Sequence, residues 1–515
     1  MATTWYCRNN HLVHRLNNHF AVMQRPVRDA LIPLIALELG SAPLYQQIYD
    51  GYRAAILEGR LRPGQRVPST RALALELGIS RLPVLTAFEQ LLHEGYIEGR
   101  AGSGTYVASS ILDPVDGAGS SRQTEPPARR SRPSRAEQDI ELPQEPTDSG
   151  AFRVSLPALD HFPSKTWARL VSRHARRMPV ELMAYGDPAG HLPLRHAIAD
   201  YLRTARAVAC DASQILIVSG SQMALQLCAR VLLKPGDAFC FEEPGYPGAR
   251  NALGATGAVV RTVPVDDDGL LVRSMGVGKH AARLAYVTPS HQYPLGVSMN
   301  VTRRLELLEW ARHHQSWIIE DDYDSEYRFA SRPLGALQGM DQASRVVYIG
   351  TFSKVLFPAL RIGYVVAPAA LVGDFTEQRR TLDLFSATLY QLALTDFLRE
   401  GHFARHIRRM RAIYLKRRDA LVEEVRRRLG GTLTIVNADA GMHLTAWLPA
   451  HVDDREVVRC AARRGISAIA LSTCYAGKAA KPGLVLGFGG TSEETVGRAV
   501  ESLAEAIAEA GARSA

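Results

Sequence analysis

The chain has 515 residues, of which 46% are hydrophobic, and a formal net charge of +9. This length predicts two or three domains with a sizeable core, and the positive charge favours a polyanionic partner. Because the chain has no apolar run of membrane-spanning length and six scattered cysteines without a Cys-x-x-Cys pair, we expect a cytoplasmic protein with no membrane anchor, disulfide framework or bound metal.

The N-terminal part of the chain carries the signals of a small helical domain. Residues 1–40 have no clear periodicity and are predicted to be an extension of unclear role. Apolar residues from Leu44 to Ile56 recur at helical spacing. Two further helices, over 70–77 and 81–93, are each preceded by a serine suited to cap them. Their short connection fits a helix-turn-helix, and residues 96–107 predict a two-stranded wing.

Several residues of this domain have chemistry suited to DNA. An arginine at the start of the second helix of the pair can contact a guanine edge or a phosphate, and a helix N-terminus attracts phosphate. A glycine in the wing lets the backbone approach DNA closely. The predicted DNA-contacting residues are Ser69, Thr70, Arg71, Ser80, Arg81 and Gly104. The alternative is a plain packing module.

Residues 43–108 resemble the winged helix of GntR-type regulators, through Leu61-Arg-Pro-Gly64, Pro68-Ser-Thr-Arg71, Leu77-Gly-Ile-Ser-Arg81, Glu94-Gly-Tyr96 and Gly102-Ser-Gly-Thr105. The resemblance implies a DNA-binding domain over 41–110 that recognises a double-stranded operator. Leu82-Pro83 departs from the polar residues common at that place, which leaves base specificity to other positions.

A region rich in Gly, Ser, Pro, Arg and Glu over 111–150 predicts a flexible linker. Beyond it, over 151–515, strands and helices alternate, which predicts an α/β domain with a mostly parallel seven-stranded sheet and a small α+β subdomain over about 431–510. A basic helix over 399–428 has either a solvated outer face or a patch for a nucleic-acid backbone. The expected strands are 215–218, 238–241, 259–263, 284–287, 317–320, 346–349 and 362–366, and the expected helices include 222–233, 302–314 and 376–400.

The loop after the strand at 346–349 holds Thr351, Ser353, Lys354 and Arg361. A lysine amine suits an aldehyde, and hydroxyls with a guanidinium suit a phosphate, so this loop indicates pyridoxal phosphate. Asp321 follows another strand, where a carboxylate can keep the pyridine nitrogen protonated. The alternatives are a solvated surface lysine and a solvated acidic turn.

Together with Gly220-Ser221-Gln222 and Glu243-Pro-Gly-Tyr246, these motifs resemble the fold-type I aminotransferases over residues 151–510. The resemblance implies that Lys354 forms the internal aldimine, that Asp321 pairs with the pyridine nitrogen, and that Tyr323 binds the phenolic oxygen. It places Tyr246 beside the ring and assigns the phosphate to Ser221, Gln222, Thr351, Ser353 and Arg361. Tyr185 resembles the tyrosine that reaches the cofactor of a partner subunit, which implies a dimer.

The aminotransferase pattern is broken at two places. The late strand Gly483–Gly489 lacks the arginine that holds a substrate α-carboxylate, and the turn from His291 to Gly296 has Gln292 or Tyr293 in place of an asparagine. Loss of a bidentate clamp removes about 2–3 kcal/mol of substrate binding. We therefore expect the ligand to be the cofactor itself or an amine without an α-carboxylate, with no efficient turnover.

The order of winged helix, linker and aminotransferase-like domain resembles the MocR subfamily of GntR regulators over nearly the whole chain beyond residue 40. It implies a transcription regulator that senses a small molecule through pyridoxal phosphate and forms a domain-swapped, head-to-tail homodimer. One alternative is an aminotransferase with an appended DNA module, whose carboxylate clamp comes from Arg250 or Arg332. Another is a degenerate domain used only for dimerisation.

Overall fold

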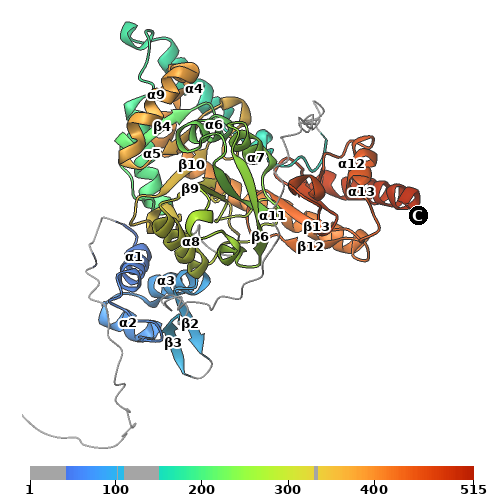
Figure 1. Ribbon diagram of the computed structural model, residues 1–515, viewed down its shortest axis with the longest axis horizontal. Helices are drawn as coiled ribbons and strands as arrows, with labels where there is room; N and C mark the ends of the chain where they lie inside the picture. Colours follow the sequence, from blue (N-terminus) through green and yellow to red (C-terminus); the bar gives the residue numbers. More distant parts are fainter. Residues whose placement is uncertain (1–36, 38–41, 101–102, 109–149, 330–334, 515) are drawn as a thin grey trace, which may run out of the picture. The chain divides into compact units, whose positions relative to one another are not determined.

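The computed structural model describes residues 37, 42–100, 103–108, 150–329 and 335–514. They form two compact units, an N-terminal one with most of residues 42–107 and a larger one that contains 150–514 (Figure 1). The predicted extension over 1–40, apart from Leu37, and the predicted linker up to residue 149 lie outside the described residues. None of the helices in the described part of the chain has the length and apolarity to cross a membrane.

The N-terminal unit has the predicted winged-helix elements. Helix α1 buries Ile48, Tyr52 and Ile56, the residues at helical spacing in the sequence. One strand, β1, was not expected, because two residues are too short to carry a pattern; it pairs antiparallel with β3. The sheet order is β1-β3-β2. The elements are α1 (Leu44–Leu57), β1 (Arg66–Val67), α2 (Thr70–Glu76), α3 (Arg81–His93), β2 (Ile97–Arg100) and β3 (Gly104–Val107).

The larger unit is built on an eight-stranded sheet with the order β4-β11-β10-β9-β8-β5-β6-β7. All seven predicted strands are present, and the eighth, β7, is a two-residue strand that pairs antiparallel with β6 at the edge. Strands β10, β9, β8, β5 and β6 run parallel, whereas β11 is antiparallel to both its neighbours. The bounds are β4 (Ile215–Val218), β5 (Ala238–Glu243), β6 (Val259–Asp266), β7 (Gly269–Leu270), β8 (Leu284–Val287), β9 (Trp317–Asp322), β10 (Val346–Thr351) and β11 (Gly363–Val366).

Helices cover both faces of this sheet. Alternate strand residues face opposite ways, so Phe241 and Tyr286 pack in the core with α6 (Ser221–Leu232). Their neighbours Cys240 and Ala285 pack in a second core with α8 (Val301–His314). Figure 1 shows α6 and α8 on opposite sides of the strands. Two buried faces explain why the strands read as continuous apolar runs.

One predicted helix, 376–400, is wrong as a single element. The structure divides it into α9 (Val372–Asp383) and α10 (Thr388–Arg399). Leu384 has a φ of 63°, which ends the first helix, and Ser386 in the break accepts a hydrogen bond from Arg379. The remaining helices of this part are α4 (Ser164–Ala175), α5 (Leu192–Arg206) and α7 (Pro247–Gly254).

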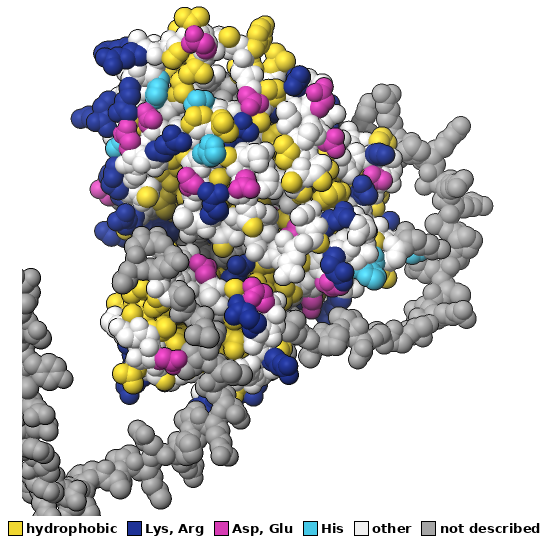
Figure 2. Space-filling model, turned by 90° about the vertical axis from the view of Figure 1, so that its left-hand side faces the viewer, with side chains coloured by type: hydrophobic (Ala, Val, Ile, Leu, Met, Phe, Trp, Pro, Cys, Tyr) yellow, Lys and Arg dark blue, Asp and Glu magenta, His cyan; other side chains and the backbone are white. Residues whose placement is uncertain are grey.

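The basic helix predicted over 399–428 is α11 (His402–Leu429). Part of its charge stabilises the fold, since Arg417 is buried and bonds Gly489 O, and Arg411 donates to Glu326 O. Arg408 and Lys416 are exposed. Lys and Arg side chains gather along one edge of the face drawn in Figure 2.

The predicted small subdomain contains a four-stranded antiparallel sheet with the order β12-β13-β15-β14. Helices α12 and α13 contribute buried apolar residues to the core shared with this sheet. The elements are β12 (Thr434–Asn437), β13 (His443–Trp447), α12 (Asp454–Ala462), β14 (Ile469–Ala470), β15 (Gly483–Gly487) and α13 (Glu493–Ser514).

Candidate functional site

The predicted site lies where β9 and β10 end. These strands are parallel neighbours, and Asp321 on β9 is paired with Ile349 on β10. The polar residues that follow both strands therefore emerge at one edge of the sheet, where ligands of α/β proteins bind. Lys354 follows the end of β10 by three residues, and its charge lowers the pKa of the Asp321 carboxyl against the effect of burial.

Asp321 is the most informative residue of the site. It is 5% exposed, and its Oδ2 accepts a hydrogen bond of 2.8 Å from the hydroxyl of Tyr286. Its Oδ1 is buried and has no hydrogen-bond partner among the described residues. Burial raises the pKa of this carboxyl to about 6, against the opposing effects of Tyr286 and Lys354. A buried carboxylate oxygen without a donor costs about 1–3 kcal/mol, so the site fits a ligand that donates there, as a protonated pyridine nitrogen does.

A second group of residues suits a phosphate. Helix α6 begins after Gly220, which has a φ of 91° and a Cβ position only 3.0 Å from Arg361 Nη1. Arg361 Nη2 donates to Ser219 O at 2.6 Å, so the guanidinium lies beside the start of α6. Ser221 and Gln222 are the first two residues of that helix. A helix N-terminus and a guanidinium side by side attract a phosphate.

The other predicted cofactor residues occupy the surroundings of these two groups. Thr351 and Ser353 are buried, and the Thr351 hydroxyl accepts a hydrogen bond of 3.2 Å from the Ser353 N–H. The Gln222 amide donates to the hydroxyl of Tyr246 at 2.9 Å, which ties the tyrosine to the first turn of α6.

Tyr323 belongs to a buried cluster that the sequence did not reveal. Its hydroxyl donates to His291 O at 2.9 Å, and His291 Nδ1 lies 2.9 Å from Asp324 Oδ1. His443 comes from β13, and its ring is 4.9 Å from that of His291. Burial lowers the pKa of His443 well below its usual value, and the charges of His291 and Lys354 lower it further.

The same cluster is the one group of three side chains, within the described ranges, with the spacing to hold a metal ion. Ligand atoms of His291, Asp324 and His443 lie within 4.8 Å of one another. The hydrogen bond between His291 and Asp324 accounts for their closeness without an ion. The sequence could have pointed to His291, because this residue stands in the turn that departs from the aminotransferase pattern. No pattern in the sequence pointed to His443.

Gln292 and Tyr293, the two residues that could replace the asparagine of aminotransferases, have different surroundings. The Gln292 amide is occupied, since it donates to Pro244 O at 2.8 Å and to Tyr293 O. The Tyr293 ring lies 5.5 Å from that of Tyr246 and 6.3 Å from that of Tyr323. Tyr293 therefore forms the wall of the site on this side.

The late strand β15 has no room for an arginine at its glycines. A Cβ on Gly487 would collide with the Arg153 carbonyl, and one on Gly483 would lie 2.8 Å from Ala446 O. The residues between them are buried and apolar. The α-carboxylate clamp of aminotransferases is thus missing from this strand, whose glycines have no room for a side chain and whose other residues are apolar.

Tyr185 is not brought together with the other predicted residues within one chain. It is 86% exposed and makes an edge contact with Phe385. Val180 and Met183, on the same segment, are also exposed apolar residues.

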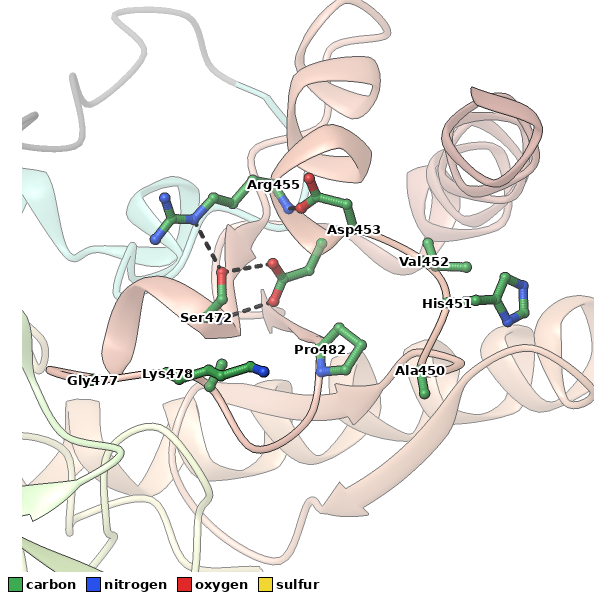
Figure 3. A pocket seen from close by; sticks show the side chains of 11 residues that line it. Ala450, His451, Val452, Asp453, Arg455, Ser472, Gly477, Lys478 and Pro482 are labelled. Carbon is green, nitrogen blue, oxygen red and sulfur yellow. Dashed lines mark hydrogen bonds between the residues drawn. The ribbon is translucent and has the colours of Figure 1, made fainter. Parts of the chain in front are cut away.

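A surface hollow of about 470 Å³ lies elsewhere, in the small subdomain, and none of the predicted residues lines it (Figure 3). Asp454 there accepts hydrogen bonds from Ser472 and from the Gly483 N–H, and Arg455 donates to the Ser472 hydroxyl. Because these donors satisfy the buried carboxylate of Asp454, it does not indicate a ligand in the hollow.

In the N-terminal unit, the predicted DNA-contacting residues gather at the ends of two helices. Ser69 caps α2 by accepting from the Ala72 N–H at 3.2 Å. Arg81, the first residue of α3, donates to the Thr70 hydroxyl at 3.0 Å, and the side chains of Arg71 and Ser80 are exposed. A further basic residue, Arg66 on β1, was missed; its guanidinium lies about 3 Å from the Cβ position of Gly104 in the wing.

Comparison with known proteins finds a matching family for each of the two parts of the chain. The family of class I and II aminotransferases matches residues 156–503, and the gntR family of bacterial regulatory proteins matches residues 44–107. Kynurenine aminotransferase from Pyrococcus horikoshii is similar in structure, with a TM-score of 0.66, 28% identity, and coverage of 74% of this chain and 95% of that one. The protein is therefore a DNA-binding regulator with an aminotransferase-like domain.

Two curated regulators show the family more closely. The chain is 41% identical to the probable rhizopine catabolism regulatory protein MocR of Rhizobium meliloti, over 90% of this chain and 94% of that protein. It is 32% identical to the pyridoxine biosynthesis transcriptional regulator PdxR of Corynebacterium glutamicum, over 90% and 95% of the two chains. The chain belongs to the MocR-type regulators of the GntR family.

Proposed function

We propose that this regulator binds pyridoxal phosphate covalently at Lys354 and that the state of this site controls its binding to operator DNA. The observation that carries the proposal is Asp321, a buried carboxylate with one oxygen that has no donor among the described residues, on the strand paired with the one that leads to Lys354. When bound, pyridoxal phosphate supplies an electron-withdrawing ring and a carbonyl carbon that captures primary amines.

The surrounding residues have distinct parts in this proposal. Tyr286 orients Asp321, which then holds a proton on the pyridine nitrogen. Arg361 and the start of α6 hold the phosphate. Tyr246, fixed by Gln222, packs beside the ring. Thr351 and Ser353 add hydroxyls for the phosphate. Tyr323 turns its hydroxyl, which donates to His291 O without a ligand, to the phenolic oxygen.

The geometry favours sensing over efficient transamination. Strand β15 lacks the arginine that aminotransferases use, and close packing at Gly487 keeps a side chain out. We infer that the effector is the cofactor itself or an amine without an α-carboxylate. The second candidate function, an aminotransferase with a DNA module, needs a clamp elsewhere. Arg332 lies outside the described residues, and Arg250 lies on α7 with one side-chain nitrogen, Nη1, buried without a partner among them.

We infer further that the working unit is a homodimer, in the domain-swapped, head-to-tail arrangement. Support comes from three large apolar residues exposed within one short segment, Val180, Met183 and Tyr185, since exposed apolar surface is a feature of interaction sites. In such a dimer Tyr185 reaches the cofactor of the partner.

The test is a titration of operator DNA with the apo protein, the protein loaded with pyridoxal phosphate, and the loaded protein with added amines, followed by fluorescence anisotropy. We expect DNA affinity or bending to change between these states in wild type but not in Lys354→Ala. Identical behaviour of all states would refute the sensor function. Multiple turnovers with a keto-acid acceptor would favour the enzyme.

A further inference from the structure

His291 and Asp324 form a buried pair beside Tyr323, to which the proposed function gives no part. Nδ1 of the histidine lies 2.9 Å from Oδ1 and 3.1 Å from Oδ2 of the carboxylate, and both side chains are buried. The N–H of Met442 donates to the same carboxylate at 3.3 Å. An ionised carboxylate only accepts hydrogen bonds, so His291 Nδ1 carries the proton between the two side chains. The pair therefore presents an oriented N–H donor inside the site.

The hydroxyl of Tyr323 lies between two groups of this histidine. It donates to His291 O at 2.9 Å, and its oxygen lies 3.1 Å from Nδ1. A hydroxyl both donates and accepts, so the Nδ1–H that points at Asp324 also serves the tyrosine oxygen. When the hydroxyl turns its proton to a ligand, it leaves His291 O and keeps the contact with Nδ1. The histidine thus holds the tyrosine oxygen in place while the proton changes its acceptor.

Packing from the small subdomain fixes the His291 ring. A Cβ on Gly441, which has a φ of 75°, would collide with this ring and with the Asp324 carboxylate, so the chain passes directly against the pair. The ring of His443 lies 4.9 Å from that of His291. It is also nearly parallel to the ring of Tyr323, at 6.5 Å and 17°. The pair, the tyrosine and the start of β13 therefore form one packed unit.

The groups around Tyr323 keep its hydroxyl protonated. Burial raises the pKa of this tyrosine well above its usual value, and the charge of Asp324 raises it further. The titratable groups that act on Tyr323 or lie beside it are His291 and Tyr293 of the turn, Asp321 and Asp324 at the end of β9, Glu242 of β5 and His443 of β13. A protonated hydroxyl is the donor that a negatively charged phenolic oxygen requires.

We propose that His291 and Asp324 are positioning residues, which hold the Tyr323 hydroxyl and its proton toward the phenolic oxygen of pyridoxal phosphate bound at Lys354. The inference rests on the proposed function, because it needs the cofactor at Lys354. A hydrogen bond to the phenolic oxygen favours the form in which this oxygen has its full negative charge, with the Lys354 nitrogen deprotonated. The pair should therefore lower the pH at which the bound cofactor changes its absorbance.

The experiment measures the absorbance of the cofactor bound to the full chain as a function of pH. Tyr323→Phe removes the hydroxyl and should raise the midpoint of the change by roughly one pH unit. His291→Leu removes the Nδ1 donor and should raise it by a similar amount. His291→Asn places an amide N–H near the position of Nδ1 and should restore the wild-type midpoint. The double variant of Tyr323→Phe and His291→Leu should shift no further than Tyr323→Phe, because both changes act through one hydroxyl.

His174 provides the matched control. Its Nε2 lies 2.8 Å from Asp396 Oδ2, in a second histidine–aspartate pair that joins α4 to α10. His174→Leu should leave the midpoint at its wild-type value. A shift in this variant equal to that of His291→Leu would show a general effect of breaking such a pair and would refute the positioning role.

The outcomes separate this inference from the proposed function. If wild type shows no absorbance of a cofactor bound at Lys354, the proposed function fails. If the cofactor binds but Tyr323→Phe or His291→Leu keeps the wild-type midpoint, or the two shifts add in the double variant, the positioning role is refuted. Melting temperature identifies a variant that fails to fold. His291→Phe, whose ring fills a similar space without a donor, then decides in place of His291→Leu.

Discussion

Substitution of Asp321 by asparagine should have opposite effects on stability and on cofactor binding. Burial raises the pKa of the carboxyl from 3.8 to about 6, so the folded protein holds an ionised group in an unfavourable place. That difference corresponds to about 3 kcal/mol of lost stability above pH 6. The folded state binds the proton more tightly than the unfolded state does. The loss of stability is therefore absent below about pH 4 and grows as the pH rises to 6. Asp321→Asn removes this charge and should stabilise the apo protein at pH 7.5.

The same change should weaken binding of pyridoxal phosphate. The unpaired Oδ1 would lose a charge-assisted hydrogen bond to the pyridine nitrogen and keep at most a neutral one, a difference of about 1–2 kcal/mol, or roughly 5- to 30-fold in affinity. Wild-type affinity should also fall as pH drops below about 6, where the free carboxyl takes up a proton. Denaturant unfolding of the apo protein and absorbance titration with the cofactor measure the two effects.

Asp322 provides the control for this prediction. It is the next residue on β9, and its Oδ2 accepts hydrogen bonds from Arg206 at 2.8 Å and from Tyr348 at 2.6 Å. Asp322→Asn should therefore destabilise the apo protein, because it breaks a buried ion pair. If Asp321→Asn destabilises the apo protein in the same way and leaves cofactor affinity unchanged, Asp321 is a structural residue and the reasoning fails.

Three further substitutions test other parts of the molecule. Arg361→Ala should weaken pyridoxal phosphate about 10- to 100-fold but leave pyridoxal, which has no phosphate, unchanged in an absorbance titration; equal losses for both would contradict a phosphate contact. Leu82 offers no polar contact to a base, but it is 70% exposed at the start of α3, where an apolar side chain suits a thymine methyl group. Leu82→Ser should therefore weaken a thymine-containing operator more than its uracil-substituted copy. An equal loss for the two DNAs in an anisotropy assay excludes that contact. Tyr185→Ala should speed cofactor loss from the dimer in a dilution assay, and an unchanged rate would remove this residue from the partner's site.

The strands at the site were predictable because they are buried on both faces. Such strands read as short apolar runs, and the motifs with Asp321 and Lys354 follow two of them directly. The break between α9 and α10 had no such signal, since neither glycine nor proline marks it and Leu384 takes a left-handed conformation that its residue type rarely adopts.

The parts of the site that the sequence did not reveal depend on tertiary contacts. Tyr286 lies within an apolar strand, where it reads as a core residue, yet its hydroxyl orients Asp321. His443 comes from the small subdomain and meets His291 only in the folded chain. Arg250 could be named from the sequence, but only the folded structure shows that its Nη1 is buried without a hydrogen-bond partner among the described residues.

The central claim is that Lys354 carries the cofactor. Borohydride reduction of the protein after mixing with pyridoxal phosphate, followed by peptide mass spectrometry, tests it directly. We expect one modified peptide, containing Lys354, and no adduct in Lys354→Ala. An unmodified Lys354, or an adduct spread over other lysines, would contradict the account.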